Sequence, residues 1–77
     1  MSRSPRLSGT EIIKTLTKEF GFSAVRQRGS HIVLRKFVNG RKVVTVVPLH
    51  RDVKTGTLLG ILELAGIKKE EFLARVK

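Results

Sequence analysis

The sequence predicts a small α+β domain in which helices pack against one face of a three-stranded antiparallel sheet. One amphipathic helical pattern stands near the N-terminus, and another follows residue 56. Between them lies a stretch rich in Val, interrupted by two turn signals, Gly29-Ser30 and Asn39-Gly40. A chain of 77 residues forms one domain, because domains typically contain about 50–200 residues. The expected order is α-β-β-β-α with a short extra C-terminal helix.

The first helix is expected to end before Gly21, because glycine readily takes the left-handed conformation that stops a helix. Ser8 or Thr10 can cap the start of this helix. One helix face is apolar, at Ile12, Ile13, Leu16 and Phe20. Residues 1–8 are expected to form a disordered basic tail, and residues 9–77 a single domain.

Three strands are expected over residues 22–28, 31–38 and 41–48, joined by two-residue turns. In the register that follows, Arg28 lies opposite His31 and Val25 opposite Leu34, while Thr45 lies opposite Leu34 on its other side. The core face of the sheet then contains Val25, Ile32, Leu34, Val43 and Val47. The opposite, open face contains Arg26, Arg28, His31, Arg35 and Lys42, together with Val33, Phe37, Val44 and Val46.

A second helix is expected over residues 57–65, followed by Gly66 as its stop. Its apolar stripe consists of Leu58, Ile61, Leu62 and Ala65. Gly60 inside this helix costs about 1 kcal/mol relative to Ala, which predicts close packing at that turn. The short last helix is expected over residues 69–76, with Phe72 and Val76 facing inward.

The charge of the chain is strongly positive and unevenly distributed. Sixteen Lys and Arg residues stand against 6 Asp and Glu, which gives a net charge of +10. Residues 21–51 alone contain seven basic residues and no acidic one. A basic excess confined to one segment is typical of nucleic-acid binding. We therefore expect RNA or another polyanion as a partner.

The composition also excludes several classes of protein. The chain has no cysteine, which excludes disulfide staples and cysteine-based metal sites. Neither a Gly-rich phosphate loop nor an HExxH motif occurs, so no cofactor and no metal are expected. The longest apolar stretch, residues 43–49, is far shorter than the roughly 20 residues of a membrane helix. Residues 1–6 lack the character of a signal peptide, so a cytoplasmic location without membrane contact is expected.

The most informative segment is Arg26-Gln27-Arg28-Gly29-Ser30-His31. It places a histidine directly after a tight turn, with arginines beside it. A neutral imidazole can take the proton of an RNA 2′-OH as a general base. Cationic side chains can stabilise the extra negative charge of the phosphorane without a metal ion. From these residues alone, His31 is either such a base, an ordinary surface residue or a residue that contacts phosphate.

Longer motifs, taken together, carry a family resemblance. In order, they are Gly21-Phe22, the segment from Arg26 to His31, Val47-Pro48-Leu49-His50, Gly56-Thr57-Leu58 with Ile61-Leu62, and Ala65-Gly66 with Glu70-Glu71-Phe72-Leu73. This set, over residues 10–76, resembles the HicA family of toxin mRNA interferases from toxin–antitoxin systems. The resemblance implies a fold like the double-stranded-RNA-binding domain and metal-independent cleavage of mRNA.

The resemblance also assigns roles to residues and partners. It implies that His31, in the Gly-Ser-His turn, is the essential catalytic residue. It further implies a cognate HicB-type antitoxin that binds the toxin and covers the site. The expected RNA contacts on the basic face are Arg26, Arg28, Ser30, Arg35 and Lys42.

Several alternatives stay open at this point. The same domain could bind structured RNA without cleaving it, or could be a pure interaction protein that uses the apolar part of its open face. An aromatic surface for stacking single-stranded bases is not expected, because the chain has four Phe and neither Tyr nor Trp. His50 could be a second acid/base group, a phosphate ligand or, as favoured here, a local hydrogen-bond partner. The sequence names no general acid.

Overall fold

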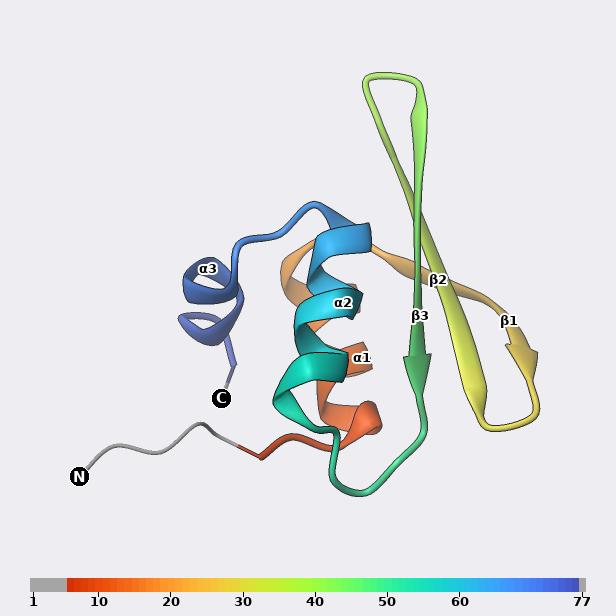
Figure 1. Cartoon of the computed structure of the whole chain (residues 1–77). Coiled ribbons are helices and arrows are strands. Elements are labelled where there is room, and N and C mark those ends of the chain that lie inside the picture. The colour runs from red at the N-terminus through yellow and green to blue at the C-terminus, as the bar shows by residue number, and fades with distance from the viewer. Residues whose placement is uncertain (1–5, 77) are drawn as a thin grey trace.

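The computed structural model describes residues 6–76 and shows the predicted order of elements (Figure 1). Helix α1 spans Gly9–Glu19, and three strands follow, β1 (Ser23–Arg28), β2 (His31–Val38) and β3 (Arg41–Pro48). Helices α2 (Thr55–Ala65) and α3 (Lys69–Leu73) complete the chain. This is an α+β arrangement like that of the double-stranded-RNA-binding domain. Helix α2 begins at residue 55 rather than 57, and α3 ends at residue 73 rather than 76.

The start of α1 is fixed by a capping box. The Ser8 hydroxyl accepts a hydrogen bond from the Glu11 amide over 3.1 Å, and the Glu11 carboxylate accepts one from the Ser8 amide over 2.9 Å. Two backbone donors that the helix itself leaves unpaired are thereby satisfied. Of the two residues predicted to cap this helix, Ser8 is the cap.

The predicted boundary between tail and domain needs a correction. Residues 1–5 of the predicted disordered tail lie outside the described residues. Leu7, however, is only 5% exposed and forms a β-bridge with Val53. The Val53 amide donates to the Leu7 carbonyl over 2.8 Å. Leu7 and Ser8 therefore belong to the folded domain, and the predicted start at residue 9 is wrong.

The second hairpin has the predicted register throughout. The strand order is β1-β2-β3. Val38 pairs with Arg41, and Leu34 pairs with Thr45. Both turn residues, Asn39 and Gly40, have positive φ angles of 53° and 78°. This backbone twist matches that of the flanking strands, which explains why Asn-Gly fixes the register. The end of the β2–β3 hairpin extends beyond the helices (Figure 1).

The first hairpin departs from prediction at one residue. Arg28 pairs with His31 and Arg26 with Val33, as expected, but Leu34 pairs with Ala24 instead of Val25. An irregularity between Ala24 and Arg26 leaves Val25 as an extra residue, as in a β-bulge. Val25 is 43% exposed, so its predicted place in the core is wrong.

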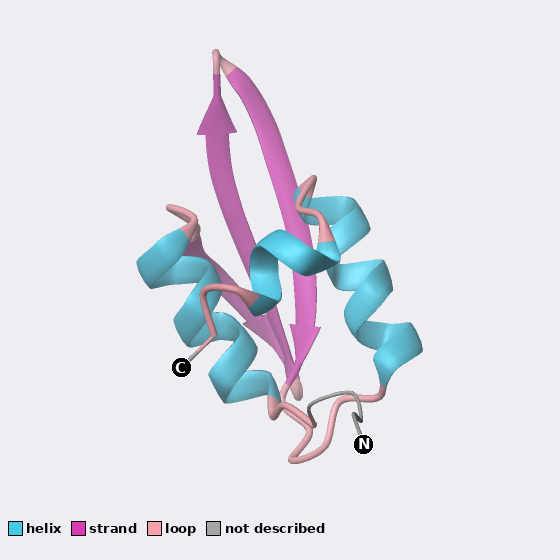
Figure 2. Cartoon of the chain, turned by 90° about the vertical axis from the view of Figure 1, so that its left-hand side faces the viewer, coloured by secondary structure: helices cyan, strands magenta, loops and turns pink. Residues whose placement is uncertain are grey.

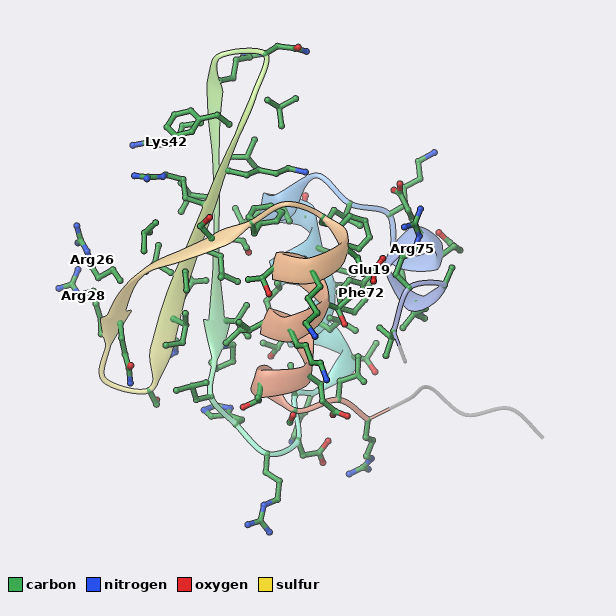
Figure 3. The ribbon with its side chains drawn as sticks, turned by 180° about the vertical axis from the view of Figure 1, so that it is seen from behind. Glu19, Arg26, Arg28, Lys42, Phe72 and Arg75 are labelled. Atoms are coloured by element: carbon green, nitrogen blue, oxygen red, sulfur yellow. The ribbon has the colours of Figure 1, made fainter. Side chains whose placement is uncertain are left out.

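Helices α1 and α2 cover one face of the sheet, and the other face is left bare by them (Figure 2). Helix α3 packs outside them through Phe72, whose ring stacks on Phe20 at a centroid distance of 6.2 Å. Figure 3 shows Phe72 pointing inward, while Arg75 reaches Glu19 of α1 at 3.4 Å. The core contains Leu7, Ile12, Leu16, Phe22, Leu34, Val47, Val53, Leu58, Ile61, Leu62, Ala65, Ile67 and Phe72.

The two glycines of α2 behave differently. Gly66 ends the helix in the left-handed conformation, with φ of 73°, as predicted. Gly60 is exposed, and a Cβ added there would meet no atom within 4 Å. The predicted close packing at Gly60 is therefore wrong. None of the helices in residues 6–76 is long and apolar enough to cross a membrane.

Candidate active site

The bare face of the sheet carries His31 and two arginines of β1 at one end. Arg28 lies directly opposite His31, and Arg26 lies two residues further along β1. All three residues are exposed. Figure 3 shows both arginine side chains projecting away from the helices. The sequence prediction that these residues share one face is correct, and Ser30, also exposed, precedes His31 in the turn.

Two further candidates share this face but lie far from His31. Arg35 follows His31 by four positions along β2, and Lys42 pairs with Phe37, six positions along. At about 3.3 Å per strand residue, these distances are roughly 13 Å and 20 Å. Arg35 and Lys42 therefore lie on the same face as His31 but well away from it. Lys42 projects on the same side of the sheet as the β1 arginines (Figure 3).

Not every basic residue of the central segment faces this way. The Lys36 ammonium donates to the Phe20 carbonyl over 3.0 Å and lies 4.9 Å from the centre of the Phe22 ring. Lys36 is half-buried on the helix side of the sheet. Its charge therefore supports the fold and lies off the open face.

An exposed aromatic ring lies at the far end of the open face. Phe37 is 62% exposed, and the Arg35 guanidinium carbon lies 5.2 Å from the centre of its ring. This distance is within the range of a cation–π contact. The composition predicts no aromatic stacking surface, and this exposed ring with an arginine over it departs from that expectation.

The structure brings His31 and His50 together, although the sequence predicts separate roles for them. The ring centroids of His31 and His50 are 6.5 Å apart, with 66° between the ring planes. The strand register explains this proximity, because His31 pairs with Pro48. Pairing continues past the strand end, where the Leu49 amide donates to the Ser30 carbonyl over 2.6 Å. The predicted Asn39-Gly40 register already places residue 48 opposite residue 31, and that signal was available in the sequence.

The loop that carries His50 is held by the N-terminus of α1. The Gly9 amide donates to the His50 carbonyl over 2.8 Å. Only glycine fits at this position, because an added Cβ would lie 1.9 Å from the Pro48 carbonyl oxygen. Further along the loop, the Arg6 guanidinium pairs with the Asp52 carboxylate. The backbone around His50 is thus anchored on both sides.

Both imidazoles are accessible to a ligand. His31 and His50 are exposed, and within residues 6–76 neither ring makes a hydrogen bond. Their charged surroundings are Arg28 opposite His31, and Arg51 with the paired Asp52 next to His50. Over the same residues, no three His, Asp or Glu side chains gather as a metal site requires. The groups exposed at this end of the sheet are two imidazoles, which can exchange protons, and guanidinium groups, which carry positive charge.

The comparisons with known proteins identify the family. A family model described as the HicA toxin of bacterial toxin–antitoxin systems matches residues 9–67. The match runs from the first residue of α1 past the end of α2 and includes both histidines. A search of curated proteins finds no match. Because the family model covers most of the chain, the protein belongs to the HicA family of toxins.

Proposed function

We propose that this toxin is a metal-independent endoribonuclease of a type II toxin–antitoxin system and that it cleaves mRNA with His31 as its catalytic residue. Membership of the HicA family supports a toxin that acts on RNA and has a cognate antitoxin. The observation that carries the proposal is an exposed imidazole on the bare sheet face, directly opposite an arginine. A base and a cation side by side are what cleavage of RNA through its own 2′-OH requires.

The proposed reaction begins at the 2′-OH of the substrate. His31 takes the proton while the 2′ oxygen forms a bond to the adjacent phosphorus. The bond from phosphorus to the 5′ oxygen then breaks and this oxygen takes up a proton, which yields a 2′,3′-cyclic phosphate and a free 5′-OH. Arg28 and Arg26 stabilise the extra negative charge of the phosphorane, and cations aimed at developing charge lower such barriers substantially.

The rest of the open face holds the RNA strand. Arg35 and Lys42 contact phosphates away from the cleaved bond, because they lie on the same face but further along β2 and β3. Ser30 offers its hydroxyl to the phosphate at the turn. Contacts of this kind position the backbone and give binding that weakens as salt increases.

We further propose that a HicB-type antitoxin covers this face. The face combines exposed arginines with exposed apolar side chains, Phe37 and Val44 among them. An acidic partner surface complements the charge, and the apolar side chains supply area to bury. Covering the face would block access of RNA to His31.

The test of this function is an RNA cleavage assay with the purified full chain in the presence of EDTA. We expect cleavage with products that carry a cyclic phosphate and a 5′-OH. RNA that stays intact while its mobility on a gel is shifted would instead support a binding module without catalysis. Cleavage that EDTA abolishes would contradict the metal-independent mechanism.

A further inference from the structure

We propose that His50 is the general acid of this reaction and donates the proton that the leaving 5′ oxygen needs. This inference rests on the proposed ribonuclease function and adds a second catalytic residue to it. It starts from the distance of 6.5 Å between the centroids of the His31 and His50 rings.

The spacing of the two rings suits a phosphodiester between them. A general acid or base must come within about 2.6–3.2 Å of the oxygen it serves. Two stacked imidazoles in van der Waals contact would leave no space for a phosphate, and a much wider gap would leave one oxygen out of reach. With the rings 6.5 Å apart and inclined by 66°, one nitrogen of each can approach a different oxygen of the same phosphate.

The contacts of His50 fix its backbone and leave its ring free. Its carbonyl accepts from Gly9 over 2.8 Å, and its neighbour Leu49 donates to Ser30 over 2.6 Å. The β-bridge between Leu7 and Val53 anchors the loop beyond it. A histidine kept only as a local hydrogen-bond partner would use its ring for this purpose, but within residues 6–76 the ring of His50 makes no hydrogen bond.

The protons and electron pairs of the step balance between the two histidines. The 2′-OH gives its proton to neutral His31, and its oxygen electron pair forms the new bond to phosphorus. The pair from the broken bond stays on the 5′ oxygen, which takes a proton from cationic His50. His31 ends protonated and His50 neutral, and exchange with water restores both. The charged groups around the pair are Arg28, Arg51 and the Asp52 carboxylate that Arg6 engages.

The experiment separates a general acid from a phosphate ligand by changing the leaving group. After a cleavage site is mapped with the unaltered protein, the same RNA is made with sulfur in place of the bridging 5′ oxygen at that site. A thiolate leaves without protonation, so this substrate does not need a general acid. We expect His50→Ala to lose about 10²–10⁴-fold in rate on ordinary RNA. On the sulfur-containing RNA, we expect the cleavage rate of His50→Ala to return to within about tenfold of the rate of the unaltered protein, since the leaving thiolate needs no proton donor.

The controls keep failure of this inference distinct from failure of the proposed function. His31→Ala is expected to lose cleavage on both substrates, because the base is needed for either leaving group. Cleavage of ordinary RNA by folded His50→Ala at the unaltered rate would overturn the role of His50 and leave that of His31 intact. An equal loss on both substrates would also overturn it, and would indicate phosphate binding or loop structure.

A second variant guards against misfolding. His50→Gln keeps the backbone carbonyl that Gly9 uses and offers a polar side chain without acid function. It should show the same loss and the same rescue by sulfur as His50→Ala. Lys14→Ala, an exposed charge on α1, should cleave both substrates at the unaltered rate. Absence of cleavage by the unaltered protein would overturn the proposed function, and this inference with it.

Discussion

The amide of Gly9 donates a hydrogen bond to the carbonyl of His50 over 2.8 Å, which ties the first helix to the loop beside His31. This contact connects the fold to the site. The first turn of α1 supplies a backbone donor that the helix itself leaves unpaired. The absence of a side chain at Gly9 lets the loop approach, since a Cβ there would lie 1.9 Å from the Pro48 carbonyl oxygen.

We therefore predict that Gly9→Ala destabilises the protein and lowers its cleavage rate together. The added methyl group must displace the Pro48 carbonyl, and overpacking of this kind typically costs about 1–3 kcal/mol. The displaced loop carries His50, so the geometry of the histidine pair changes as well. Urea denaturation measures the loss of stability, and a cleavage assay under native conditions measures the rate. An unchanged free energy of unfolding would show that the loop around Pro48 accommodates the added methyl group without loss of stability.

Gly60→Ala is predicted to have the opposite effect on stability. Gly60 lies inside α2 with open space around it, so an alanine meets no neighbour. Glycine in a helix costs about 0.5–1 kcal/mol relative to alanine, and the substitution should recover this amount. The same urea titration measures it, and cleavage should not change. Destabilisation would indicate a contact at Gly60 that the structure does not show.

Arg28→Ala is predicted to weaken RNA binding and to lower its salt dependence. One phosphate contact contributes about 0.7–0.9 to the slope of log affinity against log salt, so the slope should fall by about this amount. Lys14→Ala is the matched control, because it removes an exposed positive charge from α1 on the helix side of the sheet. For Lys14→Ala, the slope of log affinity against log salt should equal that of the unaltered protein. Equal slopes for Arg28→Ala and the unaltered protein would place Arg28 off the path of the RNA.

Phe37→Ala is predicted to weaken binding of single-stranded RNA without affecting the fold. The ring is 62% exposed, so its removal leaves the core intact. Stacking of one base on an aromatic ring contributes about 1–3 kcal/mol, which corresponds to a loss of roughly 5–150-fold in affinity. Phe37→Tyr keeps the ring and should bind like the unaltered protein. Equal affinities for the Ala and Tyr variants would show that no base stacks there.

The sequence predicts the architecture well because its turns are strong local signals. Asn39-Gly40 determines the pairing of β2 with β3 throughout, and Gly66 ends α2 as expected. The error at Val25 has a physical origin. Strict alternation along a strand assumes no inserted residue, and a bulge on an exposed edge strand is not specified by hydrophobic pattern. The prediction at Gly60 fails because a glycine inside a helix can also lie on its solvent-exposed side.

The placement of the site is predicted only in part. Arg26, Arg28 and His31 share a face because alternation and the Gly29-Ser30 turn place them there. The register set by Asn39-Gly40 brings Pro48 opposite His31, but the position of His50 also depends on pairing that continues past Pro48 and on a helix start that holds the loop. Considered alone, His50 suggests a local hydrogen-bond role. Only the pairing of their strands brings the two rings together.

The most direct test of the central claim compares the unaltered protein with His31→Ala in an RNA cleavage assay that contains EDTA. Circular dichroism and binding of the cognate antitoxin confirm that the variant is folded. We predict that the unaltered protein cleaves RNA and that folded His31→Ala leaves it intact. Cleavage by folded His31→Ala at the rate of the unaltered protein would contradict the assignment of His31 as the catalytic residue.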